Sequence, residues 1–201
     1  MARLRSPEKR VAILEAATAE IAEGGLGVAT AKIARRAGIA EGTLFTYFAS
    51  KDELLNAVYM ELKTEAYARI HHGFPIHSSL EQRARHIWFR YISWVADAPA
   101  KRKAVAQLSV SEVVTSATRA KAAKGWDGVE RMLSELGEQG PLRALPTGYV
   151  SALMLAMQEA TMEYAARKPR QKDQIVEGGF AAFWRACGGQ AAGGGIHPRN
   201  K

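Results

Sequence analysis

Apolar residues recur at intervals of three and four along most of the chain, which is the spacing of one face of an α-helix. Near the start, Ile13, Leu14 and Ile21 fall on such a face. Ser6 and Pro7 precede them, and serine at the N-cap with proline at the first helical position is a strong signal for a helix start. We find no stretch with the alternation of a β-strand. The pattern therefore predicts an all-α protein of about nine helices.

Glycine and proline residues divide the rest of the chain into further helices. The expected helices after the first lie at about 30–37, 42–48, 51–72, 78–95, 99–113, 118–136, 147–168 and 172–187. Serine N-caps with an acidic residue three positions later, at Ser50 with Glu53 and at Ser78 with Glu81, predict capping boxes for two of them. From residue 188 the chain is rich in glycine, and we expect a disordered tail over 188–201.

The two short helices within 30–48 carry the most informative pattern of the chain. Gly38 ends the first of them, because the residue after a helix often adopts the left-handed conformation that glycine tolerates. In the second, Leu44 and Phe48 face inward at 100° per residue. A helix this short needs its neighbours to hold it. Its outward face carries small, hydroxylated and phenolic side chains, namely Gly42, Thr43, Thr46 and Tyr47. The arrangement predicts a helix-turn-helix.

Four sequence blocks around this motif occur in a recognisable order and spacing. They are I-L-E-A-A at 13–17, I-A-R-R-A-G-I at 33–39, G-T-L-F-T-Y-F at 42–48 and S-K-D-E-L at 50–54. With them, about the first 55 residues resemble the DNA-binding domain of the TetR-like (tetracycline-repressor-type) family of bacterial transcriptional regulators. Ala40 stands where serine is common in the family. Phe45 stands where tyrosine is commoner, so a phenolic contact with phosphate is not expected at this position.

The resemblance implies that residues 1–55 form a helix-turn-helix domain that binds double-stranded operator DNA. It implies phosphate contacts for Tyr47 and Lys51. By their chemistry, Thr43 and Thr46 suit base edges or thymine methyl groups, and Glu41 either accepts from a cytosine amino group or is a solvated residue at a helix start. The predicted DNA-binding residues, of which the first two lie at the front of the preceding helix, are Thr30, Lys32, Glu41, Gly42, Thr43, Thr46, Tyr47 and Lys51.

The resemblance also implies a larger ligand-binding and dimerisation domain over 56–187. In the family, the last two helices pair with those of a second subunit to form a homodimer. The helix at 147–168 is apolar on most sides, which fits that role independently, although the chain's own helices are the other possible cover. The predicted interface residues are Leu153, Met157, Ile175, Gly178, Gly179 and Phe183.

The same domain holds many aromatic and thioether side chains, which are either ordinary core residues or the walls of an inducer site. In the family, a small-molecule inducer bound there releases the DNA, so we expect a repressor with an inducer of unknown identity. The candidate pocket residues are Trp88, Tyr91, Met132, Met154, Met157 and Gln158. Basic clusters at 101–103 and 167–172 leave open the alternative that this domain binds a protein partner instead.

Charge changes this picture little. The 201-residue chain carries a net charge of +8, but residues 1–55 contain eight Lys and Arg residues against seven Asp and Glu residues. Net charge therefore does not by itself support DNA binding. Arg3 and Arg5 are either a minor-groove arm or a frayed basic terminus.

Several other classes of function lack their sequence signals. Four histidines, at 71, 72, 77 and 86, lack the spacing of a metal site, and no nucleotide-binding or catalytic motif occurs. We therefore expect no enzyme, no metal and no cofactor. No apolar run is long enough to span a membrane, and the one cysteine, Cys187, is expected to be a small buried residue rather than a redox sensor. These features predict a cytoplasmic protein.

Overall fold

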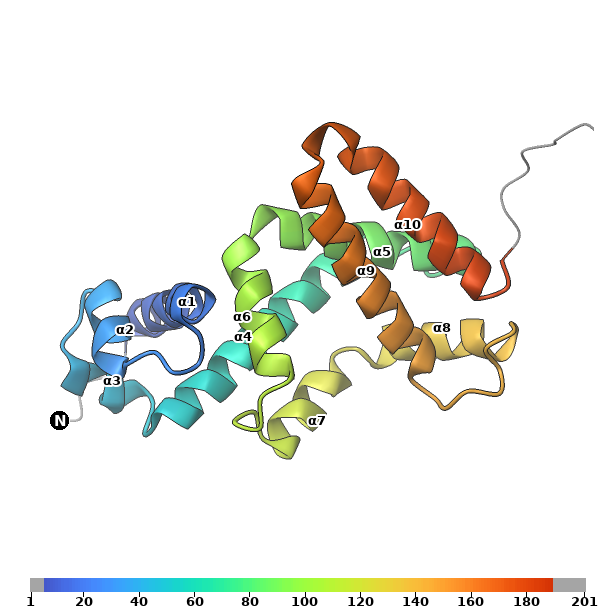
Figure 1. Ribbon diagram of the computed structural model, residues 1–201. Coiled ribbons are helices and arrows are strands. Elements are labelled where there is room, and N and C mark those ends of the chain that lie inside the picture. Colours follow the sequence, from blue (N-terminus) through green and yellow to red (C-terminus); the bar gives the residue numbers. More distant parts are fainter. Residues whose placement is uncertain (1–5, 190–201) are drawn as a thin grey trace, which may run out of the picture. The chain divides into compact units, whose positions relative to one another are not determined.

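The computed structural model describes residues 6–189, and within this range the chain is all-helical. The helices are α1 (Pro7–Gly24), α2 (Thr30–Arg36), α3 (Glu41–Tyr47), α4 (Lys51–His71), α5 (Leu80–Asp97), α6 (Pro99–Ser109), α7 (Ser116–Lys124), α8 (Asp127–Glu138), α9 (Tyr149–Arg167), the short 3₁₀ helix η1 (Pro169–Gln171) and α10 (Lys172–Ala186) (Figure 1). The all-α fold class expected from the sequence is confirmed. Arg3, Arg5 and positions 190–201 of the expected tail lie outside the described residues.

The chain clusters into two compact units. The first combines residues up to Arg69 with Trp94–Trp126, and the second combines Ile70–Ser93 with the residues from Asp127 onward. Helices α4 and α5 each run through a boundary between the two, so we describe the units separately.

In the first unit, α1, α2 and α3 surround a core of fully buried aliphatic side chains that includes Ile13, Ile33 and Leu44. Helix α6 packs along α1 (Figure 1). At one end of this contact, Gln107 Nε2 donates a hydrogen bond of 3.2 Å to the backbone carbonyl of Ile21. The same carbonyl also accepts a backbone hydrogen bond of 2.9 Å from the N–H of Gly25, so Gln107 adds a second bond there and ties α6 to the end of α1.

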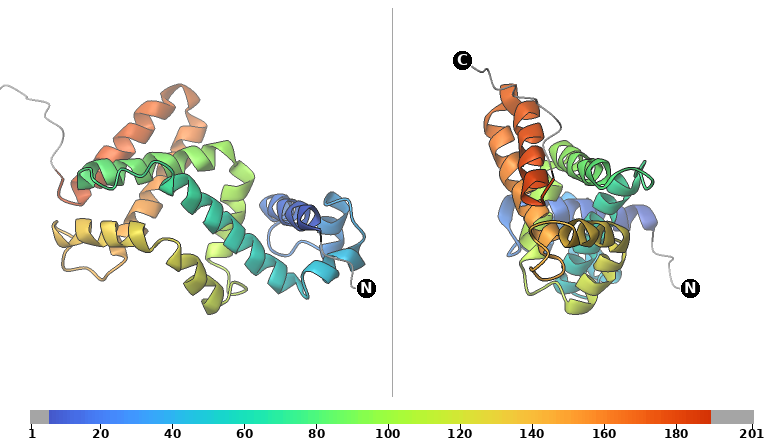
Figure 2. Two further views of the ribbon diagram at one scale, coloured as in Figure 1. Left: turned by 180° about the vertical axis from the view of Figure 1, so that it is seen from behind. Right: turned by 90° about the vertical axis from the view of Figure 1, so that its right-hand side faces the viewer.

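In the second unit, α9 and α10 form an antiparallel pair joined by η1, and they lie side by side in all three views (Figures 1 and 2). Their core is aromatic. Trp88 of α5 is fully buried, stacks on Phe183 at 5.9 Å between ring centroids and meets the edge of Phe180 at 6.1 Å. The indole of Trp88 also donates a hydrogen bond of 3.2 Å to the carbonyl of Val176.

Two local expectations differ from the structure. The single helix expected over 118–136 is divided into α7 and α8, because α7 ends at Gly125, a residue type that stabilises helices poorly. The capping box expected at Ser78 and Glu81 lies one residue later. There, the backbone N–H of Gln82 donates to Ser79 Oγ and that of Ser79 donates to Gln82 Oε1. Both pairs match the same sequence rule, and the register of α5 selects the second.

Two further observations concern the described helices. None of them combines the length and the apolar character needed to cross a membrane. Cys187 is buried as expected, and burial raises the pKa of its thiol to about 11.

Candidate nucleic-acid interface

The turn between α2 and α3 is fixed by backbone hydrogen bonds around Gly38. Gly38 has a φ of 67°, in the left-handed region that the sequence predicts for it. Its N–H donates to the carbonyl of Arg35, and the N–H of Ile39 donates to that of Ala34. This pair of bonds is the Schellman motif, which satisfies the last carbonyls of a helix and turns the chain sharply. The turn therefore sets the angle at which α3 leaves α2.

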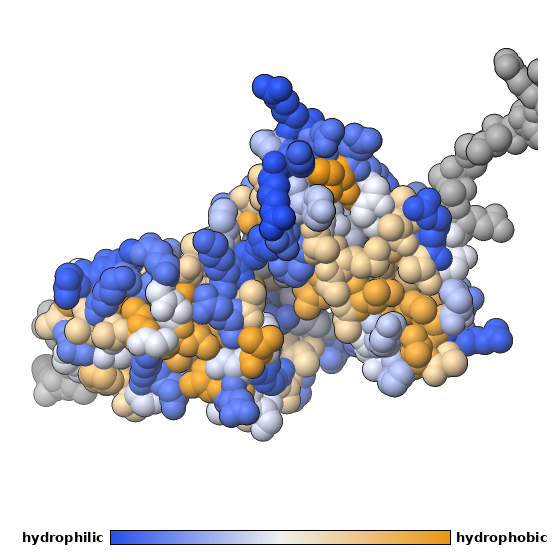
Figure 3. Space-filling model, in the orientation of Figure 1, coloured by the Kyte–Doolittle hydropathy of each residue, from blue (hydrophilic) through white to orange (hydrophobic). Residues whose placement is uncertain are grey.

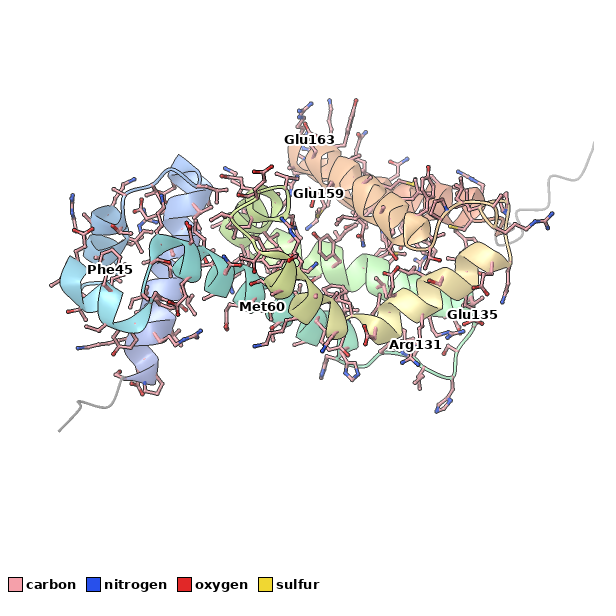
Figure 4. All side chains as sticks on the ribbon, turned by 90° about the horizontal axis from the view of Figure 1, so that it is seen from below. Phe45, Met60, Arg131, Glu135, Glu159 and Glu163 are labelled. Atoms are coloured by element: carbon pink, nitrogen blue, oxygen red, sulfur yellow. The ribbon has the colours of Figure 1, made fainter. Side chains whose placement is uncertain are left out.

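Helix α3, the second helix of the helix-turn-helix, is anchored through one face. Leu44 and Phe48 are buried, as predicted, whereas Phe45 exposes 44% of its surface (Figure 4). Glu41, Gly42 and Thr46 are also exposed. Helix α4 then begins at a capping box, in which Ser50 Oγ accepts from the N–H of Glu53 and the Glu53 carboxylate accepts from the N–H of Ala49. The helix is thus held at both ends, and a polar strip with one aromatic ring faces outward.

A buried carboxylate ties α2 to α1. Glu20 of α1 is 2% exposed, and its two oxygens lie 2.7 Å from Lys32 Nζ and 2.7 Å from Arg36 Nε. The remaining nitrogens of Arg36 donate to the exposed Glu23 at 2.7 and 2.8 Å. These hydrogen bonds hold the pKa of Glu23 below its ordinary value. We call this group of four residues the α1–α2 clamp.

Two predicted DNA-binding residues have partners inside the chain that the sequence did not reveal. Lys32 belongs to the α1–α2 clamp, although about half of its side chain remains exposed. Thr30 Oγ1 donates a hydrogen bond of 2.6 Å to the carboxylate of Glu41, which joins the start of α2 to the start of α3. The structure therefore brings Thr30 and Glu41 together, and it gives Glu41 a partner that neither of the expected interpretations included.

The other predicted DNA-binding residues lie on or beside α3. The phenolic oxygen of Tyr47 accepts a hydrogen bond of 3.0 Å from the N–H of Ser6, which leaves the phenolic proton available for another acceptor. Thr46 Oγ1 donates to the carbonyl of Thr43 within the helix. Gly42 faces open space, and Lys51 occupies the first position of α4. Donors of both kinds, hydroxyl and ammonium, thus flank the exposed face of α3.

The predicted ligand-pocket residues are packed within the second unit. Trp88, Met132, Met154 and Gln158 are at most 3% exposed, Tyr91 is 9% exposed and Met157 is half-buried. Gln158 Nε2 donates to the backbone carbonyl of Trp88 at 3.4 Å. A pocket of about 210 Å³ in this unit lies between α8 and the start of α9. Ser134, Glu138, Arg143 and Tyr149 contribute to its walls, which contain none of the predicted pocket residues.

The predicted interface residues divide into outward-facing and inward-facing groups. Leu153, Met157 and Ile175 are half-buried and Gly178 is exposed. Phe183 is fully buried against Trp88, so its side chain offers no surface to a second chain. Gly179 also faces inward, because a Cβ atom there would lie 2.4 Å from Thr161 Oγ1 and 2.9 Å from a ring carbon of Trp88.

Sequence reasoning missed the most exposed apolar residues of α9. Tyr149, Leu155 and Tyr164 expose 44%, 46% and 63% of their surfaces. In Figure 3, the side of α9 and α10 that faces the viewer is mostly apolar. The apolar composition of this helix is visible in the sequence, and it indicates that one face packs in the core while apolar residues on the other stay exposed. Periodicity alone does not show which of these residues face the core and which are exposed.

Comparison with known proteins finds similarity to one family of regulatory proteins. Residues 13–58 match the model of the bacterial regulatory proteins of the tetR family. A tetR family transcription regulator from Shewanella sp. PV-4 is 28% identical, with a TM-score of 0.79 over 90% of this chain and 98% of that one. A TetR family protein from Vibrio parahaemolyticus is also 28% identical, with a TM-score of 0.68 over 89% and 97%. The regulator FadR from Bacillus subtilis, solved in complex with stearoyl-CoA, shares the fold at 17% identity, with a TM-score of 0.63 over 85% and 97%.

Proposed function

We propose that this chain, whose residues 13–58 match the model of the tetR family of bacterial regulatory proteins, is a repressor that binds a palindromic operator as a homodimer and leaves it when a small molecule binds. The observation that carries this proposal is the recognition helix α3, whose buried face is anchored while its polar face is exposed and flanked by hydroxyl and ammonium donors. The protein then acts in the cytoplasm, where the chromosome lies, and has no catalytic role.

The DNA contacts divide by chemistry. Tyr47 donates its phenolic proton to a phosphate, and Lys51 adds a charge beside the backbone donors at the start of α4. Thr43 and Thr46 meet base edges or thymine methyl groups. Glu41 accepts from a cytosine amino group only if it gives up the hydrogen bond from Thr30, so base contact at this position competes with a contact inside the protein.

Thr30 and Lys32 flank these contacts from α2. Thr30 is hydrogen-bonded to Glu41 and Lys32 is paired with Glu20. Each can contact phosphate or base only with the part of its side chain that remains exposed. Gly42 contributes no side chain, and the open space around it lets the backbone of α3 approach the groove. Together these residues form a surface with few charges, which suits recognition by shape and hydroxyl groups.

The homodimer forms through α9 and α10. Three large apolar side chains on α9, those of Tyr149, Leu155 and Tyr164, are exposed, and exposed apolar surface of this kind is typical of a protein–protein interface. Leu153 and Met157 of α9, with Ile175 and Gly178 of α10, are at least partly exposed and belong to the proposed interface. Phe183 and Gly179 are left out of the proposed interface, because both are occupied within the chain. A two-fold dimer supplies two recognition helices, as a palindromic operator requires.

The ligand response rests on the family. FadR from Bacillus subtilis was solved with stearoyl-CoA, so one protein of this fold binds a small molecule. A protein partner remains the second candidate. Trp88, the largest predicted pocket residue, packs against Phe180 and Phe183 in the core and is therefore a structural residue rather than the wall of a ligand site.

The test is binding of the purified protein to the DNA upstream of its own gene, measured by fluorescence anisotropy over a salt series with random DNA as competitor. We expect binding that resists the competitor, with two subunits on one short palindrome. Affinity equal to that for random DNA would contradict sequence-specific regulation at this site, and fragments from the rest of the genome would then be selected by the same assay.

A further inference from the structure

Lys63, in the first unit, is a cation without a counter-charge among the described residues. Lys63 lies on α4, one turn before Tyr67, and its ammonium group sits 4.6 Å from the ring centroid of Trp126. Among the described residues, no carboxylate forms an ion pair with Lys63 and no acceptor takes a hydrogen bond from it. Burial lowers the pKa of Lys63, so the protein holds this amine where its charge is poorly solvated.

A second donor beside Lys63 is also unsatisfied. The indole Nε1 of Trp126 is buried and has no hydrogen-bond partner within the described range. Tyr67 packs its ring against the same indole at 5.9 Å between centroids. Buried donors are nearly always paired in folded proteins, because an unpaired one loses its hydrogen bonds to water without compensation. Two adjacent donors without an acceptor are the arrangement that an anionic ligand completes.

The surroundings favour an anion over a neutral ligand. One turn before Lys63, the ring of Tyr59 lies under the guanidinium of Arg119 at 5.8 Å. Arg119 donates to the carbonyls of Ser109 and Ser111, which are neutral groups and do not offset its charge. Arg119 therefore places a second positive charge without an ion-pair partner, among the described residues, one turn of α4 away from Lys63.

We propose that the ammonium of Lys63 and the indole N–H of Trp126 bind the carboxylate group of an organic acid. A single unpaired cation matches one negative charge, whereas phosphate groups are usually held by arginine forks or several backbone donors. The rings of Tyr67 and Trp126 supply apolar surface for the body of the acid. The proposed site assigns a class of ligand, organic acids, to the regulator. The further expectation that this ligand releases DNA rests on the function proposed above.

The site lies on the helix that starts directly after the recognition helix. Lys51 opens α4 and Lys63 lies twelve residues further along the same helix. An acid that binds Lys63 more tightly in one position of α4 than in another shifts the balance between these positions. Occupation of the site is therefore expected to reduce operator affinity.

The experiment is isothermal titration of the full chain, without DNA, using benzoate and octanoate as probes and benzamide as the neutral comparison. We expect both carboxylates to bind and benzamide not to bind. Lys63→Met keeps the length of the side chain and removes its charge, and should weaken carboxylate binding at least about tenfold. Trp126→Phe keeps an aromatic ring and removes the N–H, and should weaken it by a smaller factor. Lys124→Met, which removes an exposed charge from α7, is the matched control and should bind as the unaltered chain does.

Equal binding by the unaltered chain and by Lys63→Met would overturn the proposal, as would failure of both carboxylates to bind. Circular dichroism establishes that each variant is folded. Operator binding is measured separately by anisotropy, with and without the carboxylate that binds best. Carboxylate binding that leaves operator affinity unchanged would keep the site and contradict its role in release, so the two proposals fail in distinguishable ways.

Discussion

At the scale of single residues, the proposed DNA interface contains groups suited to phosphate contacts and groups suited to base contacts. Lys51 carries a charge at the start of α4, and no described residue neutralises it. Thr46 has an exposed methyl group and a hydroxyl that is already bonded within its helix. Charge acts on every phosphate alike, whereas a methyl group distinguishes one base from another.

Lys51→Ala should therefore weaken binding to operator and to random DNA by similar factors, and should reduce the slope of log affinity against log salt by about one. Thr46→Ala should leave the slope unchanged and alter the preferred bases at one or two positions. Anisotropy over a salt series, combined with selection from a randomised operator, measures both. A change of base preference in Lys51→Ala would contradict the phosphate role.

Adjacent glycines in α10 offer a comparison between an inward and an outward position. A methyl group at Gly179 would overlap Thr161 and Trp88, both of which are buried, whereas one at Gly178 meets no atom of the chain within 4 Å. We expect Gly179→Ala to lower the free energy of unfolding by about 1–3 kcal/mol. Gly178→Ala should raise it by up to about 1 kcal/mol, because alanine favours the helix. Urea unfolding followed by circular dichroism compares the two, and equal effects would contradict the close packing of α10 on α9.

At the scale of elements, the α1–α2 clamp fixes the helix-turn-helix on its support. Removing one partner of a buried ion pair leaves the other charges uncompensated, which is more costly than losing an exposed pair. Glu20→Gln should therefore lower the free energy of unfolding by about 3 kcal/mol. Glu23→Gln, which loses an exposed contact to the same Arg36, should lower it by clearly less. Similar losses in both variants would show that Glu20 is not buried as described.

A second polar group joins α4, α5 and α6. Glu65 accepts hydrogen bonds from Lys101 Nζ at 2.6 Å and from Trp94 Nε1 at 3.0 Å. Burial alone would raise the pKa of Glu65, but these two donors outweigh it and hold the pKa below its ordinary value of 4.5. A carboxyl group whose pKa is lower in the folded state stabilises the fold above its unfolded pKa, and this contribution is lost as the pH falls through the folded pKa.

The chain should therefore lose stability as the pH falls below about 4.5, and Glu65→Gln should lose less over the same interval. Thermal unfolding between pH 3 and pH 7 measures the difference, with Glu112→Gln, an exposed substitution in the same unit, as the control. Parallel curves for the Glu65→Gln variant and the unaltered chain would exclude a contribution from this group.

Features that depend on neighbouring residues, such as helix ends and helix faces, were predictable from the sequence. The side-chain pairs that join separate helices were not. Gly38, Leu44 and Phe48 took the expected positions, because a helix end and a helical face are set by residues within a few positions. The pairing of Glu20 with Lys32 and that of Thr30 with Glu41 depend on how separate helices meet. The exchange of Ser78 for Ser79 as the cap of α5 shows that even a local rule fails when two neighbouring residues satisfy it equally.

At the scale of the whole molecule, the proposed binding to a palindromic operator depends on assembly of two chains. Leu155 lies on the exposed side of α9, and Glu159 and Glu163 continue along the same helix (Figure 4). If this face is covered by its own copy, each substitution acts twice, because a two-fold interface contains the residue from both chains. Burying one leucine side chain contributes about 1.5–3 kcal/mol.

Leu155→Glu should therefore weaken the dimer by about 3 kcal/mol or more, which is roughly hundredfold in the dissociation constant. Val110→Glu is the matched control, because Val110 is 86% exposed and lies outside the proposed interface. Sedimentation equilibrium gives the dissociation constants, and anisotropy shows whether operator affinity falls with them. An intact dimer in Leu155→Glu would move the interface away from α9. A monomeric Leu155→Glu variant that kept full operator affinity would instead contradict the proposal that operator binding requires the homodimer.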